Sequence, residues 1–359
     1  MAEYSTSQKS SPGISVPTTD KAVGIWLLLV AVLIALIVIV GGLTRLTESG
    51  LSITEWRPVT GIFPPLSNAA WEIEFTKYRD TAQYELLNQG MGLAAFKTIF
   101  WWEWGHRFLG RIIGFVFLFP FVYFLAKKRI NGRLAARLGV IFLLGAAQGA
   151  LGWWMVQSGL AERVSVSQYR LAAHLGLAFL LFGFVFWTAL EVLGARQTEH
   201  TGLLRFQAFS WLLTILMFIQ ILLGAIVAGL DAGLAFPTWP TFAGNWIPPG
   251  LYNLAPWWIN HFENPAMTHF QHRNMGYVIA GLAIWLSSAL LRASPDKPTR
   301  IAAIYLAAFT IMQVFLGVIT VIMLVALPIA ALHQFFALAL FGATLWLAFT
   351  LTVPASNQQ

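Results

Sequence analysis

The sequence contains no cysteine and few charged residues. Of its 359 residues, only 10% are Asp, Glu, Lys or Arg, whereas soluble domains carry roughly 25% charged residues. The missing cysteines exclude disulfides, zinc–thiolate sites, iron–sulfur clusters and thiol redox chemistry. The scarcity of charge, together with 58% hydrophobic residues, predicts an all-α integral membrane protein, because a helix satisfies its own backbone hydrogen bonds in lipid.

The first 21 residues show no sign of a cleaved targeting segment. They are polar, they lack an apolar core and an A-x-A cleavage site, and they contain acidic residues but no Arg. A signal peptide or a transit peptide would have the opposite features. We therefore predict that residues 1–21 form a cytoplasmic tail and that the protein is bacterial.

Eight segments are long and apolar enough to cross a bilayer, which takes about 20 residues. They cover residues 22–44, 105–125, 138–157, 171–190, 206–230, 272–291, 301–326 and 329–353. Residues 301–353 contain no Asp, Glu, Lys or Arg. The length of this run and the proline at its middle, Pro328, predict two helices joined by a tight turn.

Basic residues are unevenly distributed among the connections. Residues 126–137, 191–205 and 292–300 are short and basic, whereas residues 45–104 and 231–271 are long. With the N-terminus inside, the inner segments hold twelve Lys and Arg against five Asp and Glu, an excess that equals the whole net charge of +7. The positive-inside rule therefore places both termini in the cytoplasm, and the basic character reflects topology rather than binding of nucleic acid.

The chain contains an internal repeat. GGLTRLTESGLSITEWRPVTGIFPP (41–65) resembles GAIVAGLDAGLAFPTWPTFAGNWIPP (224–249), which pairs Gly41 with Gly224. GAAQGALGWW (145–154) resembles IMQVFLGVIT (311–320) more weakly, through a Q-x-x-L-G core. We predict two pseudo-symmetric four-helix bundles, residues 22–190 and 206–353, joined by a cytoplasmic linker, residues 191–205. Because each has an even number of crossings, both point the same way.

Four of the seven histidines occupy matching positions. His106 and His174 lie near the start of the second and fourth predicted helices, and His272 and His333 near the start of the sixth and eighth. All four helices run from outside to inside, so the four side chains lie at the outer end. Facing side chains in a four-helix bundle build cofactor sites. One imidazole on each of two parallel helices is the pattern of bis-imidazole haem ligation, present once per half.

Helix packing and binding of a bare metal ion account less well for these histidines. A single intramembrane histidine is most often a hydrogen-bonded packing residue, but four at one depth favour ligands. Zinc would need about four converging ligands, more than one pair supplies, while copper stays open. Haem is favoured by small residues near the ligands, although helix packing in membranes also favours them. These are Gly105, Gly110, Ala172, Ala173, Gly176, Gly276, Gly281, Ala330 and Ala331.

Two arginines directly follow a candidate ligand. Arg107 follows His106 and Arg273 follows His272. A guanidinium suits a carboxylate such as a haem propionate at the outer interface, and interfacial anchoring is the alternative role. Weaker candidates for the propionate contact are Arg45, Arg111 and Arg170.

The two halves differ at one corresponding position. Glu103 precedes His106 by three residues, and His269 precedes His272 by three, which places each on the ligand's face if the helix extends that far. A carboxylate above a haem can take protons or stabilise positive charge during oxidation. This difference predicts a reaction site in the first half and an electron-carrying haem in the second. An interfacial ion pair between Glu103 and Arg107 is the alternative.

At these residues the sequence resembles heme A synthase. The matching stretches include GGLTRLTESGLSITEW, FWWEWGHRFLGR, RLAAHLG, FQHRNMGY and ALHQ, and the resemblance runs from about residue 25 to 350. It is closest to the branch shared by proteobacteria and mitochondria. The resemblance implies an oxidoreductase that converts the C8 methyl group of heme O to the formyl group of heme A, for aa3-type terminal oxidases.

The resemblance also implies roles for individual residues. His106 and His174 would hold the substrate heme O, Glu103 would assist catalysis, and His272 and His333 would ligate a haem b cofactor. The implied setting is the bacterial inner membrane, with the haem sites toward the periplasm and possible contacts with heme O synthase and cytochrome oxidase assembly factors. Some family members carry a cysteine pair in an outer loop, which this chain lacks.

Two rival classes of protein stay open on the sequence alone. A diheme b-type cytochrome that oxidises quinol would hold two stable haems, but it would not need the difference between Glu103 and His269. A transporter also uses parallel repeats, but it would place charged or broken helices near the midplane, where this sequence has almost no charge. We expect the glutamines of the third, fifth and seventh helices to make interhelical hydrogen bonds rather than substrate contacts. These are Gln148, Gln220 and Gln313.

Overall fold

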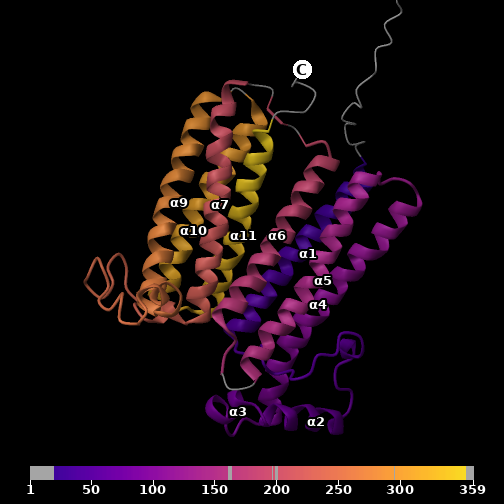
Figure 1. The fold of residues 1–359 in the computed structure, drawn as a ribbon, viewed down its shortest axis with the longest axis vertical. Helices are drawn as coiled ribbons and strands as arrows, with labels where there is room; N and C mark the ends of the chain where they lie inside the picture. The colour runs from indigo at the N-terminus through magenta and orange to yellow at the C-terminus, as the bar shows by residue number, and fades with distance from the viewer. Residues whose placement is uncertain (1–19, 161–163, 196, 199–200, 295, 353–359) are drawn as a thin grey trace, which may run out of the picture.

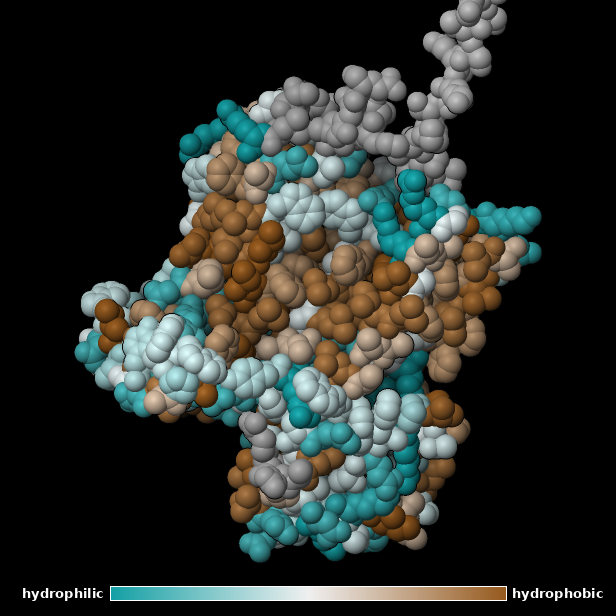
Figure 2. Space-filling model, in the orientation of Figure 1, coloured by the Kyte–Doolittle hydropathy of each residue, from teal (hydrophilic) through white to brown (hydrophobic). Residues whose placement is uncertain are grey.

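The computed structural model describes residues 20–160, 164–195, 197–198, 201–294 and 296–352. All regular elements within these residues are helices, and eight of them are long and apolar enough to cross a membrane. Figure 2 shows hydrophobic residues across the middle of the molecule and hydrophilic residues toward both ends. The predicted all-α fold with eight spans is confirmed. The spans are α1 (Lys21–Leu46), α4 (Leu93–Ala126), α5 (Gly132–Leu160), α6 (Gln168–Val192), α7 (Gln207–Gly229), α9 (Pro265–Ala293), α10 (Lys297–Ile322) and α11 (Leu327–Thr350).

Helix α4 begins much earlier than the sequence pattern predicted, at Leu93 rather than at residue 105. Its extension carries aromatic side chains, Phe96 and Phe100, which are buried against Trp71 and Phe75 of another helix. This packing stabilises helical structure outside the apolar stretch, because burying an aromatic side chain contributes about 1.5–3 kcal/mol. As a result, both residues of the Glu103–His106 pair lie in one continuous helix.

The apolar run near the C-terminus is divided into α10 and α11, as predicted. Two residues between them, Leu324 and Val325, have positive φ angles of 52° and 58°, which turn the chain within a few residues. Pro328 lies in the first turn of α11, where the N–H that proline lacks would have no intrahelical partner.

Within each half, the spanning helices form a ring of four neighbours (Figure 1). In the first half, α1 and α5 each pack against α4 and α6. In the second half, α7 and α10 each pack against α9 and α11. Therefore α4 faces α6 across the first ring, and α9 faces α11 across the second. The halves meet where α6 contacts α7 and α11, and where α1 contacts α11.

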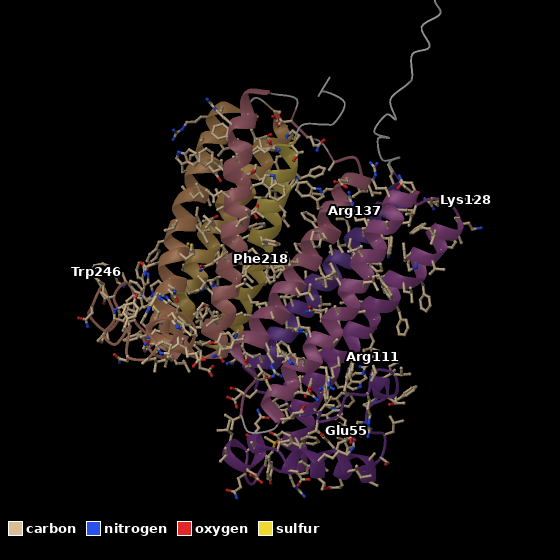
Figure 3. All side chains as sticks on the ribbon, in the orientation of Figure 1. Glu55, Arg111, Lys128, Arg137, Phe218 and Trp246 are labelled. Carbon is tan, nitrogen blue, oxygen red and sulfur yellow. The ribbon has the colours of Figure 1, made fainter. Side chains whose placement is uncertain are left out.

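The two ends of the molecule differ in structure. Helix α1 begins and α11 ends at the same end, and α2 (Asn68–Arg79) and α3 (Ala82–Leu87) lie at the opposite end (Figure 1). Lys128 and Arg137 lie at the end shared by the termini, whereas Glu55 and Arg111 lie at the other (Figure 3). Two ion pairs connect helix ends near the termini: Arg137 pairs with Glu191, and Arg129 pairs with Asp20. The cytoplasmic placement of this end stays a prediction, and the expected tail, residues 1–21, lies almost wholly outside the described residues.

A folded cap, residues 47–92, covers the first half at the end away from the termini. It contains η1 (Thr60–Ile62), α2 and α3. Tyr78 of α2 is fully buried, donates a hydrogen bond to Gln83 at 3.1 Å and accepts one from Asn88 at 2.7 Å. Burial raises the pKa of the Tyr78 hydroxyl. The corresponding segment of the second half contains only short helices, η3 (Ala232–Leu234), η4 (Trp257–Ile259) and α8 (Asn260–Glu263).

One glycine sets how closely α6 and α7 approach at the join between the halves. A Cβ on Gly229 would lie 2.7 Å from the Cα of Gln168, and a backbone atom cannot move aside without shifting its helix. We expect Gly229→Ala to lower stability by about 1–3 kcal/mol, measured as a lower melting temperature in detergent. The matched control is Gly145→Ala in α5, where a Cβ meets nothing within 4 Å. Equal melting temperatures for the two variants would contradict this account of the join.

Candidate functional site

Both predicted ligands of the first half lie against a glycine of a neighbouring helix. A Cβ on Gly41 of α1 would come within 2.9 Å of His106 Nε2. A Cβ on Gly152 of α5 would come within 2.8 Å of His174 Cε1. The imidazoles therefore occupy space that any larger residue on α1 or α5 would fill.

The second half repeats this arrangement. A Cβ on Gly224 of α7 would lie 3.0 Å from His272 Cε1, and one on Gly317 of α10 would lie 3.1 Å from His333 Cε1. In each half the ligands come from one facing pair of helices and the glycines from the other pair. In each half the two histidines lie on helices that face each other across the ring of four.

These four glycines were not among the small residues expected near the ligands. Of the expected glycines, Gly105 and Gly281 have nothing within 4 Å of a built Cβ, and Gly176 meets Leu222 of α7 instead. The signal for the four glycines was present in the repeat, which pairs Gly41 with Gly224 and aligns the two Q-x-x-L-G segments. The sequence pattern thus showed that these glycines belong to the repeated segments, but it did not show that they contact the histidines.

Two observations indicate that these imidazoles are suited to bind haem iron. The Nδ1 atoms of His174, His272 and His333 are buried without a hydrogen-bond partner, which leaves imidazole nitrogens uncommitted. The glycine contacts provide a backbone-lined surface beside each ring. Within the described ranges, no three His, Asp or Glu converge as a metal site. A pair of histidines on facing helices would therefore suit a haem iron better than a four-ligand zinc site.

Glu103 is buried, and both of its carboxylate oxygens accept hydrogen bonds. Its side chain accepts hydrogen bonds at Oε2 from Ser52 Oγ (2.8 Å) and from the backbone N–H of Ile53 (2.7 Å). At Oε1 it accepts from Arg107 Nη2 (2.6 Å) and Nε (3.1 Å). The ion pair considered as the alternative role is therefore present, and Glu103 is only 2% exposed. The carboxylate joins α4 to the start of the cap.

Arg107 fastens the cap as well as pairing with Glu103. Its Nη1 donates to the backbone oxygen of Glu55 (3.0 Å), and its Nη2 donates to that of Ile53 (2.9 Å). With the two bonds to Glu103, these contacts use all but one of the guanidinium N–H groups. Arg107 therefore has little free capacity for a propionate.

The second half holds an imidazole where the first holds the carboxylate. His269 is 3% exposed, and its Nε2 lies 3.2 Å from Arg273 Nη2. Arg273 also donates to the backbone oxygen of Thr238 (3.0 Å) and lies over the ring of Phe242, 3.9 Å from its centroid. Each arginine therefore connects the ligand-bearing helix to the segment that precedes it at the end away from the termini, but only Arg107 has an acidic partner there.

Among the three weaker arginine candidates, Arg111 keeps a free donor. It donates to the backbone oxygens of Pro58 (2.9 Å) and Arg57 (2.8 Å), while its Nη1 is buried without a partner. Arg45 instead pairs with Asp231 across the join between the halves. Arg170 is held by the backbone and ring of Trp154.

A cavity of about 510 Å³ lies between the cap and α4. Its lining combines apolar and aromatic residues with four basic side chains, those of Arg57, Lys77, Arg107 and Arg111, and two carboxylates, Glu55 and Glu74, which pair with Arg57 and Lys77. The hydrogen bond from Lys77 lowers the pKa of the Glu55 carboxyl at its wall. The smaller cavity of about 370 Å³ beside the second half has no basic lining residue. The first cavity can thus receive an anion that carries a large apolar body.

Comparisons with known proteins identify the family. Residues 24–345 match the model of a family described as cytochrome oxidase assembly protein. The heme A synthase of Parvibaculum lavamentivorans is 49% identical over 326 residues, 90% of this chain and 93% of the relative.

Two further relatives carry the same name. The heme A synthase of Bradyrhizobium sp. (strain ORS 278) is 50% identical over 321 residues, 89% of this chain and 88% of the relative. The heme A synthase of Rhodospirillum centenum is 43% identical over 359 residues, 100% of this chain and 96% of the relative. These matches confirm the resemblance drawn from the motifs, and the chain belongs to the heme A synthase family.

Proposed function

We propose that the protein oxidises the C8 methyl group of heme O to a formyl group, giving heme A for aa3-type terminal oxidases. Family membership supports the reaction. The observation that carries the assignment to this chain is the pair of similar imidazole sites, of which only the first has a buried carboxylate, Glu103, one helical turn from a ligand. A diheme cytochrome that only oxidises quinol is not favoured, because it has no use for this difference and the relatives are heme A synthases.

The two sites would have different occupants. In the first half, His106 and His174 would hold the iron of the substrate heme O, and the lipid would receive its farnesyl chain. In the second half, His272 and His333 would hold a haem b, which supplies electron transfer when bound. The proposed setting is the bacterial inner membrane, with both termini cytoplasmic and the sites toward the periplasm, where heme O synthase and oxidase assembly factors could exchange haem with the protein.

Glu103 would act on charge and protons during the oxidation. Converting a methyl group to a formyl group replaces two hydrogen atoms with one oxygen atom and is a four-electron oxidation, which releases four protons when the oxygen comes from water. A carboxylate fixed by Ser52, the Ile53 N–H and Arg107 needs no rearrangement to stabilise positive charge that develops nearby. It can also accept a proton, with the Arg107 guanidinium as the group that keeps its orientation.

The cavity beside α4 would receive the propionate side of the substrate. Arg111 Nη1 and Trp104 Nε1 are buried donors without a partner among the lining residues. Because Arg111 is also charged, it is the first candidate for a propionate carboxylate, with the remaining N–H of Arg107 as a second. In the second half, Arg273 is the corresponding candidate for the haem b propionates.

Mass spectrometry of extracted haems tests the proposed reaction. The full-length protein is produced in a host that also makes heme O and is purified in detergent. We expect heme A or a hydroxylated heme O beside haem b. Haem b alone, with heme O present and unaltered, would favour the quinol-oxidising cytochrome.

Replacing Glu103 should separate haem binding from chemistry. We expect Glu103→Gln to retain both haems and to lower the yield of heme A by about 100-fold or more, because general acid–base groups contribute about 10²–10⁴-fold. Haem content is measured by absorption and product by mass spectrometry. The matched control is Glu85→Gln, which removes an exposed carboxylate on α3 and should give the normal yield. A normal yield from Glu103→Gln would refute the role of Glu103.

The two histidine pairs should control different haems. We expect His272→Ala to remove the haem b that remains after purification, because one axial ligand is lost. We expect His106→Ala to leave that haem in place and to abolish retention of heme O. Low-spin absorption spectra with extracted-haem analysis measure both. An unchanged haem b content in His272→Ala would contradict the ligand assignment.

A further inference from the structure

A glutamine lies four residues before three of the four glycines that contact ligand imidazoles. The sequence Q-x-x-L-G occurs in α5, α7 and α10, and it ends at Gly152, Gly224 and Gly317 respectively. Residues four apart lie on the same face of a helix. Each glutamine therefore shares the helix face that meets a ligand.

The carboxamide of each glutamine contacts the ligand on the neighbouring helix. Gln148 Nε2 donates to the backbone oxygen of His174 at 3.0 Å. Gln220 Nε2 donates to the backbone oxygen of His272 at 2.9 Å and lies 3.5 Å from its Nε2. Gln313 Nε2 lies 3.4 Å from His333 Nε2. The interhelical bonds expected of these glutamines thus end on the candidate haem ligands themselves.

Each of these contacts leaves an acceptor and an imidazole nitrogen without partners. The Oε1 atoms of the three glutamines are buried and unpartnered, as are the Nδ1 atoms of the three histidines. An imidazole that binds iron through one ring nitrogen carries its proton on the other and needs an acceptor for it. For His272 and His333, the carboxamide oxygen is an unpartnered acceptor on a side chain that the imidazole already contacts, whereas Gln148 contacts His174 through its backbone oxygen.

Helix α1 breaks the pattern. The residue four before Gly41 is Ile37, which the internal repeat aligns with Gln220. Its Cδ1 lies 3.5 Å from a Cβ built on Gly110, so it packs against α4 one turn after His106. Of the four helices that carry these glycines, only α1 has an apolar side chain at the position where the others have a carboxamide.

We propose that Gln148, Gln220 and Gln313 are positioning residues that orient the ligand imidazoles, and that Ile37 leaves His106 without this support. This inference rests on the proposed function, which supplies the iron. The haem of the second half is held by two supported ligands and stays bound. The haem of the first half is held by one supported ligand, so substrate enters and product leaves there. Residues that hold a metal ligand in this way typically contribute about 10–100-fold in metal affinity.

Haem transfer to apomyoglobin tests the inference. The purified full-length protein carrying both haems is mixed with excess apomyoglobin, and transfer is followed by absorption. We expect a fast phase from the first half and a slow phase from the second. Gln220→Leu and Gln313→Leu should accelerate the slow phase by about 10–100-fold and leave the fast phase unchanged. Gln148→Leu should accelerate only the fast phase. The second-half variants therefore serve as controls for Gln148→Leu, and Gln148→Leu serves as the control for them.

The converse variant and a redox measurement exclude a purely structural effect. Ile37→Gln should slow the fast phase, because it gives His106 a carboxamide. Gln220→Leu should also raise the midpoint potential of the second-half haem, because an imidazole without an acceptor for its N–H donates less electron density to iron. Faster release without a change in potential would overturn the positioning role.

The two proposals fail in different ways. Unchanged transfer rates in all three leucine variants, with haem b still lost in His272→Ala, would overturn the inference and leave the ligand assignment intact. Retention of haem b in His272→Ala would overturn the ligand assignment itself, whatever the glutamine variants show.

Discussion

The contact between each candidate ligand and a glycine on the neighbouring helix sets the geometry of both halves. A Cβ at any of the four glycines would lie 2.8–3.1 Å from an imidazole atom, so a larger residue would displace the ring or separate the helices. Because facing helices carry the imidazoles and the other two carry the glycines, all four helices of a ring are needed for one pair of ligands. The same contact brings the glutamines of α5, α7 and α10 onto the ligands, which lowers the penalty of placing polar groups among apolar helices.

Within this shared frame, the halves differ in what surrounds the ligands. The first half has a folded cap whose first residues bind Glu103 and Arg107, and a cavity lined by four basic and two acidic side chains. The second half has His269 in place of the carboxylate and no basic residue in its cavity. Two sites of similar ligand geometry thus have different electrostatic surroundings. That difference is what a division between a reacting haem and an electron-carrying haem would require.

Polar contacts between the halves connect the helices that carry the two sites. Gln334, which directly follows His333, donates to the backbone oxygen of Val38 at 2.8 Å. Val38 belongs to the same helix as Gly41, which contacts His106. One hydrogen bond therefore connects the helix of a second-half ligand to the helix that supports a first-half ligand. Arg45 adds an ion pair to Asp231 at the same end of the molecule.

The sequence by itself determined the eight helices, the matching positions of four histidines in the two halves and the difference between Glu103 and His269, because hydropathy, spacing and repeats are properties of short segments. Only the tertiary structure decided which helices face each other, which glycines meet the imidazoles and why α4 begins at Leu93. Glu103 shows the physical reason. Its partners Ser52 and Ile53 lie about fifty residues away in the sequence, and no local pattern records a hydrogen bond that forms only when the cap folds onto α4.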